Sequence, residues 1–351
     1  MEALYQQNQG IVREKIQGMA ISPQTSTIGI VGTGHMGSEV ARLFINAGYQ
    51  VLVNNRHKEK AQSVIKDGAQ WVDTSAALAQ QSDVILTLVG FPEEVEDLYL
   101  GDNSLLDNAK PGTYLVDMTT SSPKLAHVIS TMAEVNDLHG LDAPMAGGEL
   151  AARRGALMLM VGGEKEDYEA LKSVFDLMSS SCSYVGEAGM GQLMKLATTI
   201  TYADTLMGVV ETLSFARATH LDENRLREVV RGSNVDSSVF ENQIPKMMAD
   251  ELDDGIRVKH FCKDLGLALQ VAESYELTLP GLDVANSLYN LLNTAGGAEL
   301  ATQALILIYS DEETCFAHGL DWDEANEGGT APEQGEEQEG YTYHRRHHRT
   351  N

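Results

Sequence analysis

The chain has 351 residues, enough for two domains with hydrophobic cores, and its hydrophobic content of 43% is ordinary for a soluble enzyme. Its net charge of −26 repels nucleic-acid phosphates and anionic membrane surfaces, so neither is expected as a partner. No apolar run approaches the roughly 20 residues that cross a bilayer. Residues 1–25 form an N-terminal extension without an apolar signal core, and the three cysteines lie far apart, so we expect a reducing, cytoplasmic location.

Short apolar runs alternate with helical patterns between residues 26 and 187. In chain order the runs are TIGIV, YQVLV, DVILTLV, TYLVDM, LHGLDAP and LMLMVGG. Continuous Val, Ile and Leu runs separated by helices are typical of a parallel sheet that is covered on both faces. We therefore predict an α/β domain over residues 26–187.

A glycine-rich loop lies directly after the first of these runs and before a helical pattern. It consists of Gly32, Thr33, Gly34, His35, Met36 and Gly37. Gly32 permits a tight turn, Gly34 lets the backbone approach a pyrophosphate, and Gly37 lets the helix pack closely on the strand. This setting predicts a Rossmann-type, dinucleotide-binding domain, with the anion at the amino end of the helix.

The end of the second run distinguishes between the two nicotinamide dinucleotides. An acidic residue there would accept hydrogen bonds from the ribose 2′-hydroxyl of NAD, but this chain has Asn55 and Arg56, with Lys58 close by. A neutral-to-cationic patch suits a 2′-phosphate. NADP(H) is therefore favoured, and NAD(H) remains possible.

The second half of the chain carries longer patterns of helical period. They cover 191–218, 223–232, 236–248, 260–276 and 280–293, so we predict an all-α domain over residues 188–310. Residues 311–351 hold eleven acidic residues and three arginines, and the end of this segment has few residues that could form a core. We predict a disordered acidic tail.

Five segments, taken in order, resemble the β-hydroxyacid dehydrogenases, which include 3-hydroxyisobutyrate dehydrogenase, tartronate semialdehyde reductase and the glyoxylate/succinic semialdehyde reductases. The resemblance covers about residues 26–310. The segments are VGTGHMG, DMTTSSP at 117–123, DAPMAGGELAARRGALMLMVGG at 142–163, GMGQLMKLATT at 189–199 and KDLGLALQVA at 263–272. The resemblance implies a dinucleotide-binding domain and a helical bundle joined by a long helix, with the active site between them.

The resemblance also implies roles for individual residues. Lys195 corresponds to the family's catalytic lysine, which contacts the oxygen that is reduced or oxidised, and Thr199 lies one turn further along the helix. The nicotinamide half of the cofactor would contact Val89, Gly90, Pro92 and Thr120, and Lys263 would reach the cofactor from the helical domain. A surface ion pair between Lys263 and Asp264 is the alternative interpretation of that lysine. Ala146, Gly147 and Gly148 would bind the substrate carboxylate.

The local sequence agrees with a proton-transfer role for Lys195. Gly189 and Gly191 allow another element to approach the helix closely, and the next turn offers Thr199 instead of a carboxylate. An unpaired, partly desolvated ammonium has a lowered pKa and can act as a general acid or base. Two positions depart from the usual family pattern: Ala146 replaces a serine and Thr199 replaces an asparagine, so the sequence does not identify the substrate.

We therefore predict an NADP-preferring dehydrogenase or semialdehyde reductase that acts on a small 3-hydroxy acid, with an anionic carboxylate as substrate and no metal. Two alternatives remain: an imine-reductase-like enzyme and a catalytically silent NADP-binding protein, although relatives of both kinds usually lack the lysine at position 195. Segments 191–218 and 280–308 carry surplus apolar residues, which predicts a homodimer or homotetramer.

Overall fold

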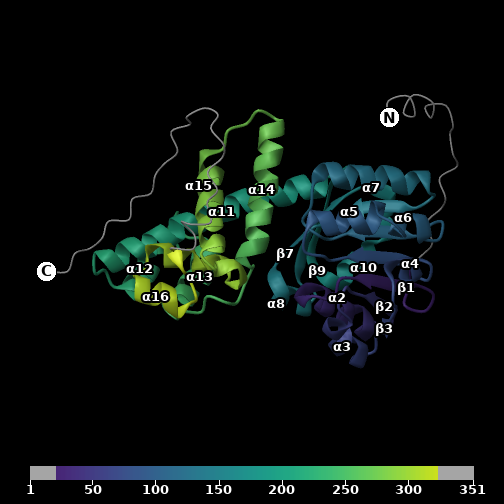
Figure 1. The fold of residues 1–351 in the computed structure, drawn as a ribbon, viewed down its shortest axis with the longest axis horizontal. Helices are drawn as coiled ribbons and strands as arrows, with labels where there is room; N and C mark the ends of the chain where they lie inside the picture. The colour runs from purple at the N-terminus through teal and green to yellow at the C-terminus, as the bar shows by residue number, and fades with distance from the viewer. Residues whose placement is uncertain (1–20, 323–351) are drawn as a thin grey trace.

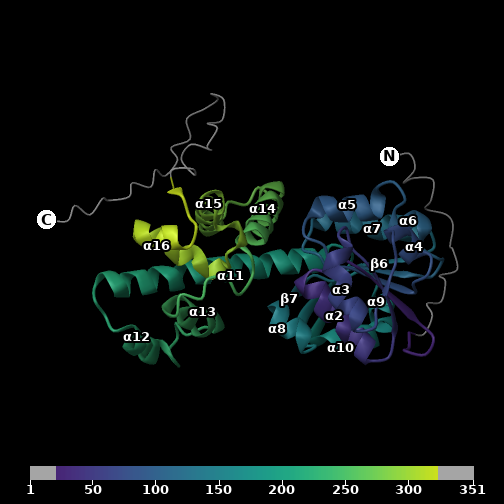
Figure 2. The same cartoon turned by 60° about the horizontal axis from the view of Figure 1, so that its bottom comes forward.

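The computed structural model describes residues 21–322, which form two lobes connected by one long helix (Figure 1). The first lobe contains all the strands, and the second contains only helices. The connecting helix, α11 (Met190–Ala218), has its amino end against strands of the first lobe, and the remainder runs through the second lobe (Figure 2). Residues 1–20 of the expected N-terminal extension lie outside the described residues.

The first lobe is built on a nine-stranded sheet. Six strands are parallel to one another in the order β3-β2-β1-β4-β5-β6, followed by β8, with β7 and β9 both paired to β8. The strands are β1 (Thr27–Val31), β2 (Gln50–Asn54), β3 (Gln70–Trp71), β4 (Val84–Thr87), β5 (Tyr114–Asp117), β6 (His139–Asp142), β7 (Met145–Ala146), β8 (Leu157–Gly162) and β9 (Ser179–Gly186).

The prediction of a wholly parallel sheet is wrong at one side, because β8 runs antiparallel to both β6 and β7. Three strands had no signal in the sequence. Strands β3 and β7 have only two residues each, and β9 has the polar sequence SSSCSYVG with no apolar run. Strand β9 forms because its backbone pairs in parallel with the apolar strand β8.

Helices cover both faces of the sheet, as predicted. Two separate hydrophobic clusters, one on each face, contain the buried residues of these helices. One face carries α2 (His35–Asn46), α3 (Lys58–Lys66), α8 (Gly148–Arg153) and α10 (Lys172–Met178), and the other carries α4 (Ser75–Ala79), α5 (Pro92–Leu100), α6 (Leu105–Asn108) and α7 (Pro123–Val135) (Figure 2). The short helix α9 (Lys165–Ala170) precedes α10.

The parallel ladder aligns the carboxyl ends of the central strands. Val31 is opposite Thr87, Thr87 is opposite Asp117, and Asp117 is opposite Asp142. The loops that follow these strands therefore emerge along one edge of the sheet, which is where ligands bind in open α/β sheets.

The second lobe packs around α11 and has a core of its own. Its helices are α12 (Glu223–Val230), α13 (Ser238–Met248), α14 (Val258–Ser274), α15 (Pro280–Thr294) and α16 (Glu312–Ala317), with 3₁₀ helices η1 (Gly297–Glu299) and η2 (Thr302–Tyr309). All the predicted helical segments are present. Among the described residues, no helix combines the length and the hydropathy needed to cross a membrane.

The boundary expected for the acidic tail, residue 311, is wrong. Helix α16 lies within the expected tail, and the Cys315 and Leu320 side chains are buried against the helical core. Asp311 caps α16 by accepting a hydrogen bond from the Thr314 backbone N–H. The high acidic content hides this short, apolar-anchored helix in the sequence. Residues 323–351 of the expected tail lie outside the described residues.

Candidate active site

The glycine-rich loop has the geometry that a pyrophosphate requires. Gly32 has a φ of +96°, and a side chain there would place its Cβ 2.3 Å from the Leu88 carbonyl oxygen. A Cβ on Gly37 would lie 1.9 Å from the Gly32 carbonyl oxygen, so the helix packs where only glycine fits. A Cβ on Gly34, by contrast, would meet no atom within 4 Å. Open space therefore lies beside the one glycine expected to face the ligand.

The amino end of α2 is also free to receive an anion. Side chains cap α4, α6 and α7 through Thr74, Ser104 and Ser122, whereas Gly34 provides no side-chain cap for α2. The Ser38 hydroxyl donates to the Thr33 carbonyl oxygen at 3.0 Å and holds the loop in shape. These residues fit a bound pyrophosphate, because the uncapped N–H groups at this terminus attract negative charge.

Two residues after β2 lie beside this loop. The Asn55 side chain accepts a hydrogen bond from the Thr33 backbone N–H at 3.3 Å. Arg56 is 72% exposed and forms an ion pair of 2.8 Å with Glu94 at the start of α5. The other carboxylate oxygen of Glu94 accepts hydrogen bonds from the N–H groups of Gly90 and Phe91. Glu94, which the sequence did not single out, therefore connects the Arg56 guanidinium to the loop at 89–92.

The amino end of α11 is anchored to the carboxyl edge of the sheet. Asp142, 1% exposed at the end of β6, accepts hydrogen bonds from the backbone N–H groups of Gly189 at 2.7 Å and Gln192 at 2.8 Å. The close approach predicted at the two glycines is confirmed. A Cβ on Gly189 would lie 2.6 Å from the Pro123 carbonyl oxygen, and one on Gly191 would lie 2.5 Å from that of Met160.

The Gln192 side chain is fully buried and holds the loop that contains Thr120. Its amide nitrogen donates to the Thr119 carbonyl oxygen at 2.8 Å, and its amide oxygen accepts from the Ser121 N–H at 2.9 Å. The Thr120 carbonyl oxygen in turn accepts a hydrogen bond of 2.5 Å from the Lys263 ammonium on α14. Helices α11 and α14 are thus both attached to one loop of the first lobe.

Lys195 lies one turn beyond Gln192, close to Lys263 and Asp264. Desolvation lowers the pKa of Lys195 below its ordinary value; the Asp264 carboxylate opposes this shift, and the Lys263 cation adds to it. Its ammonium has no hydrogen bond or ion pair within residues 21–322, although Asp264 is a nearby carboxylate that the sequence pattern did not predict. Thr199, on the next turn, is 4% exposed.

The interpretation of Lys263 and Asp264 as a surface pair is wrong. Their side chains form an ion pair of 2.8 Å, but each is only 12% exposed because the pair lies between the two lobes. His260, one turn earlier on α14, packs against Phe91 with ring centroids 5.3 Å apart. This contact, which no sequence motif indicated, joins α14 to the loop at 89–92 on the other lobe.

The segment expected to bind a carboxylate lies between β7 and α8. Ala146 ends β7, and Gly147 and Gly148 follow with φ values of +128° and +73° at the start of α8. Both φ values are in the range that favours glycine. A Cβ on Gly148 would meet no atom within 4 Å, so the backbone here is open to a small ligand.

Asp117, at the end of β5, is a buried acid that the sequence did not single out. It is 2% exposed, and its Oδ1 accepts hydrogen bonds from the Thr87 hydroxyl and the Thr119 N–H, at 2.8 and 3.1 Å. Burial raises its pKa to about 6, the hydrogen bonds from Thr87 and Thr119 oppose the shift, and Asp142 adds to it. Among the described residues, no group of three or more His, Cys, Asp or Glu side chains could hold a metal ion.

This combination of a phosphate loop, an edge of aligned loops and a lysine-bearing helical lobe defines a nicotinamide-dinucleotide-dependent oxidoreductase. Residues 27–186 match the NAD binding domain of 6-phosphogluconate dehydrogenase, and residues 189–309 match the NAD-binding domain of NADP-dependent 3-hydroxyisobutyrate dehydrogenase. The chain belongs to the β-hydroxyacid dehydrogenase family.

Individual relatives agree with this assignment. The chain is 42% identical to the uncharacterized oxidoreductase YkwC of Bacillus subtilis, over 81% of this chain and 98% of that protein. It is 33% identical to the 2-hydroxy-3-oxopropionate reductase of Escherichia coli, over 80% and 95%. The structure of Mycobacterium tuberculosis 3-hydroxyisobutyrate dehydrogenase with L-serine shares the fold, with a TM-score of 0.76 and 24% identity over 82% of this chain and 99% of that one.

Proposed function

We propose that this enzyme interconverts a small 3-hydroxy acid and the corresponding semialdehyde carboxylate, with NADP(H) as cofactor and Lys195 as general acid and base. When bound, the nicotinamide supplies or accepts the hydride. The observation that carries the proposal is the ammonium of Lys195, which is desolvated and unpaired within the described chain and lies at the junction of the two lobes.

The Lys195 ammonium has the properties that proton transfer to a carbonyl oxygen requires. Because desolvation lowers its pKa, the Nζ atom loses its proton more readily than an ordinary lysine does at neutral pH. In the reductive direction, Nζ would donate a proton to the oxygen of the aldehyde as the alcohol forms; in the other direction, it would accept that proton. The contacts of Gln192 with Thr119 and Ser121 hold Lys195 in place.

The cofactor residues divide into two groups. The N–H groups at the amino end of α2 would hold the pyrophosphate, and the buried Thr33 hydroxyl, which has no hydrogen-bond partner among the described residues, lies in the same loop. Asn55 and Arg56 would hold the 2′-phosphate. Arg56 would then exchange its ion pair with Glu94 for one with the phosphate, and its 72% exposure leaves it free to do so.

The open glycines and the names of the relatives support this substrate class. The N–H groups of Gly147 and Gly148 would bind a carboxylate, and the E. coli and M. tuberculosis relatives are named for 2-hydroxy-3-oxopropionate and 3-hydroxyisobutyrate. Ala146 provides no hydroxyl and Thr199 is shorter than asparagine by one atom, so the substrate differs from the usual one in how its polar groups are bound. An imine reductase or a silent binding protein is disfavoured because Lys195 is retained.

We also propose that the enzyme is a dimer or tetramer. Residues 302–308 of the apolar segment 280–308 are buried inside the chain and contribute no surface for a partner. An apolar groove of about 300 Å³ nevertheless lies between α11 and α14, and Tyr275 and Leu277 at its rim are 73% and 55% exposed. A second copy of the chain would cover this surface.

The test is a panel of NADPH-oxidation assays with glyoxylate, succinic semialdehyde, tartronate semialdehyde and methylmalonate semialdehyde, together with NADP⁺ reduction by the 3-hydroxy acids. We expect at least one pair to be turned over, with NADPH preferred to NADH. Tight NADPH binding without turnover of any of these compounds would contradict the proposed reaction and favour the imine-reductase or silent-protein alternative.

A further inference from the structure

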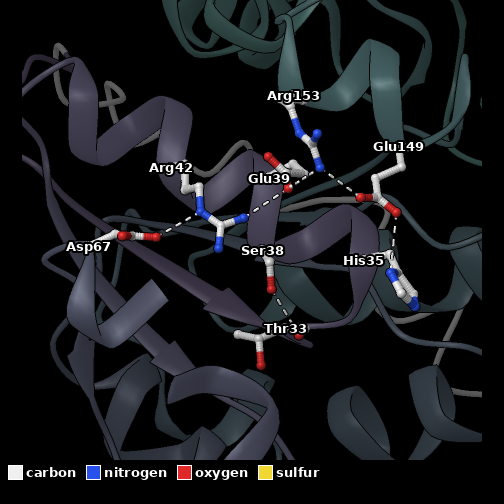
Figure 3. Close-up of polar contacts among 8 residues, drawn as sticks. All are labelled: Thr33, His35, Ser38, Glu39, Arg42, Asp67, Glu149 and Arg153. Atoms are coloured by element: carbon white, nitrogen blue, oxygen red, sulfur yellow. Dashed lines mark hydrogen bonds and ion pairs between the residues drawn. The ribbon is translucent and has the colours of Figure 1, made fainter. Parts of the chain in front are cut away.

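A continuous chain of ion pairs connects the phosphate loop to the substrate loop (Figure 3). It begins at Asp67, which accepts from Arg42 at 2.7 Å, and Arg42 also donates to Glu39 at 2.8 Å. Arg153 then contacts both Glu39 at 3.3 Å and Glu149 at 2.9 Å. The chain ends where the second oxygen of Glu149 approaches the Nδ1 atom of His35 at 3.2 Å.

The last contact of this chain, between Glu149 and His35, joins two parts of the site. His35 is in the glycine-rich loop that would hold the cofactor pyrophosphate, and Glu149 directly follows the glycines that would hold the substrate carboxylate. Both residues line the same hollow, of about 390 Å³, beside the amino end of α2. The contact between Glu149 and His35 therefore bridges the expected cofactor site and the expected substrate site.

The middle of the chain is buried at Glu39, and its His35 end is exposed. The Glu39 side chain is only 8% exposed between two arginines, and breaking such a pair would leave a buried, uncompensated charge. At the other end, the His35 side chain is 77% exposed and the Glu149 side chain is 44% exposed. Arg153 thus links α8 to the buried Glu39 of α2, while the more exposed contact between Glu149 and His35 can form or break.

The charges of the chain favour a response to the cofactor. Three carboxylates face two guanidiniums, so one negative charge is uncompensated unless the His35 imidazole is protonated. The His35 imidazole can donate hydrogen bonds to Glu149 and to a pyrophosphate oxygen at once only when both of its ring nitrogens carry protons. A His35 side chain that contacts both groups would hold the start of α8 against the phosphate loop.

We propose that Glu149 is a positioning residue that couples the two ligands: occupation of the phosphate loop tightens the contact between His35 and Glu149 and orders the substrate loop. The inference rests on the proposed binding of NADP(H). It goes beyond that proposal in stating that the enzyme binds its substrate more tightly when NADP(H) is already bound. Because coupling between binding sites is reciprocal, substrate would also strengthen NADPH binding by the same factor.

The test measures hydrogen exchange of the peptide covering residues 145–155, without substrate, before and after saturation with NADPH. Binding is followed independently by NADPH fluorescence. We compare the wild-type chain with Glu149→Gln, His35→Asn, the double variant, and His35→Lys, which keeps a cation. The matched control is Asp176→Asn, which removes another exposed ion pair of i, i+4 spacing, with Lys172 on α10.

In the wild type, the control and His35→Lys, we expect NADPH to slow hydrogen exchange in this peptide by about fivefold. This factor corresponds to a coupling free energy at the lower end of the range usual for two coupled binding sites. Glu149→Gln and His35→Asn should lose that protection, and the double variant should lose no more than either single one. Glu149→Gln should also raise KM for the carboxylate substrate about fivefold and leave kcat unchanged.

Two results would overturn the inference, and they differ in what else they affect. Full NADPH-induced protection in Glu149→Gln, with NADPH bound, would show that the ion pair transmits nothing and would leave the proposed function intact. Failure of the wild-type chain to bind NADPH would overturn the cofactor assignment and the coupling together.

Discussion

Replacing Asp117 by asparagine tests whether the carboxyl edge of the sheet contains a destabilising buried charge. Asp117 is 2% exposed, its Oδ1 accepts from Thr87 and Thr119, and its Oδ2 has no hydrogen-bond partner in the described part of the chain. Asp117→Asn keeps the accepting oxygen, places the amide group at the unpaired position and removes the charge. We expect the variant to be more stable than the wild type at pH 8.

The magnitude follows from the pKa of the carboxyl group. Burial raises this pKa from 3.8 to about 6, and each unit corresponds to about 1.36 kcal/mol, so the charged form costs roughly 3 kcal/mol of stability. Because the folded pKa is the higher one, the native state takes up a proton as the pH falls through 6, while the unfolded chain does so only near 3.8. Wild-type stability therefore gains about 1.4 kcal/mol from this group between pH 8 and pH 5, and the variant gains none.

The assay is urea unfolding of both proteins at pH 5, 6, 7 and 8, with the difference in free energy of unfolding as the measured quantity. Other titrating groups are common to the two proteins and cancel in that difference. Asp107→Asn, which removes an exposed acid on α6, is the control and should follow the wild-type pH dependence. If the difference in free energy of unfolding between the wild type and Asp117→Asn does not change with pH, the reasoning is refuted.

Three further predictions concern the proposed function. Lys195→Met, which keeps the side-chain length and removes the charge, should lower kcat by about 10² to 10⁴-fold with little change in NADPH dissociation; more than about a tenth of wild-type kcat, with chemistry rate-limiting, would contradict the proton-transfer role. Arg56→Asp should raise KM for NADPH by at least about tenfold and improve the use of NADH, since a charged hydrogen bond contributes about 1.5–3 kcal/mol; unchanged cofactor preference would remove Arg56 from the 2′-phosphate site. Analytical ultracentrifugation at micromolar concentration should show a dimer or larger species, and a monomer would exclude the proposed assembly.

The elements that the sequence predicted are those whose stability is local or strongly patterned. The apolar runs of β1, β2, β4, β5, β6 and β8 and the periodic helices of the second lobe are all present. Two glycines of the phosphate loop were predictable for a similar reason: Gly32 has a positive φ, and the close contacts at Gly32 and Gly37 leave no room for a side chain.

The elements that were missed depend on partners far away in the chain. Strand β9 is polar, and only its pairing with β8 makes it a strand. Helix α16 was included in the predicted tail because its acidic residues dominate the composition, yet the burial of Cys315 and Leu320 fixes it to the helical core. Composition reports the average of a segment, whereas one buried side chain in a short helix and one just after it are enough to fix the helix to a core.

The motif singled out Lys195, but no motif indicated the residues that position it. Gln192 and Lys195 are three residues apart and therefore on one face of α11, where Gln192 reaches Thr119 and Ser121, more than 70 positions earlier in the chain. No periodic pattern records a contact of that length. Because Lys263 binds the Thr120 carbonyl oxygen between those two anchor points, any shift of the loop would move both lysines relative to the sheet edge. The position of Lys195 and Lys263 relative to the sheet edge therefore depends on their contacts with one three-residue loop, 119–121.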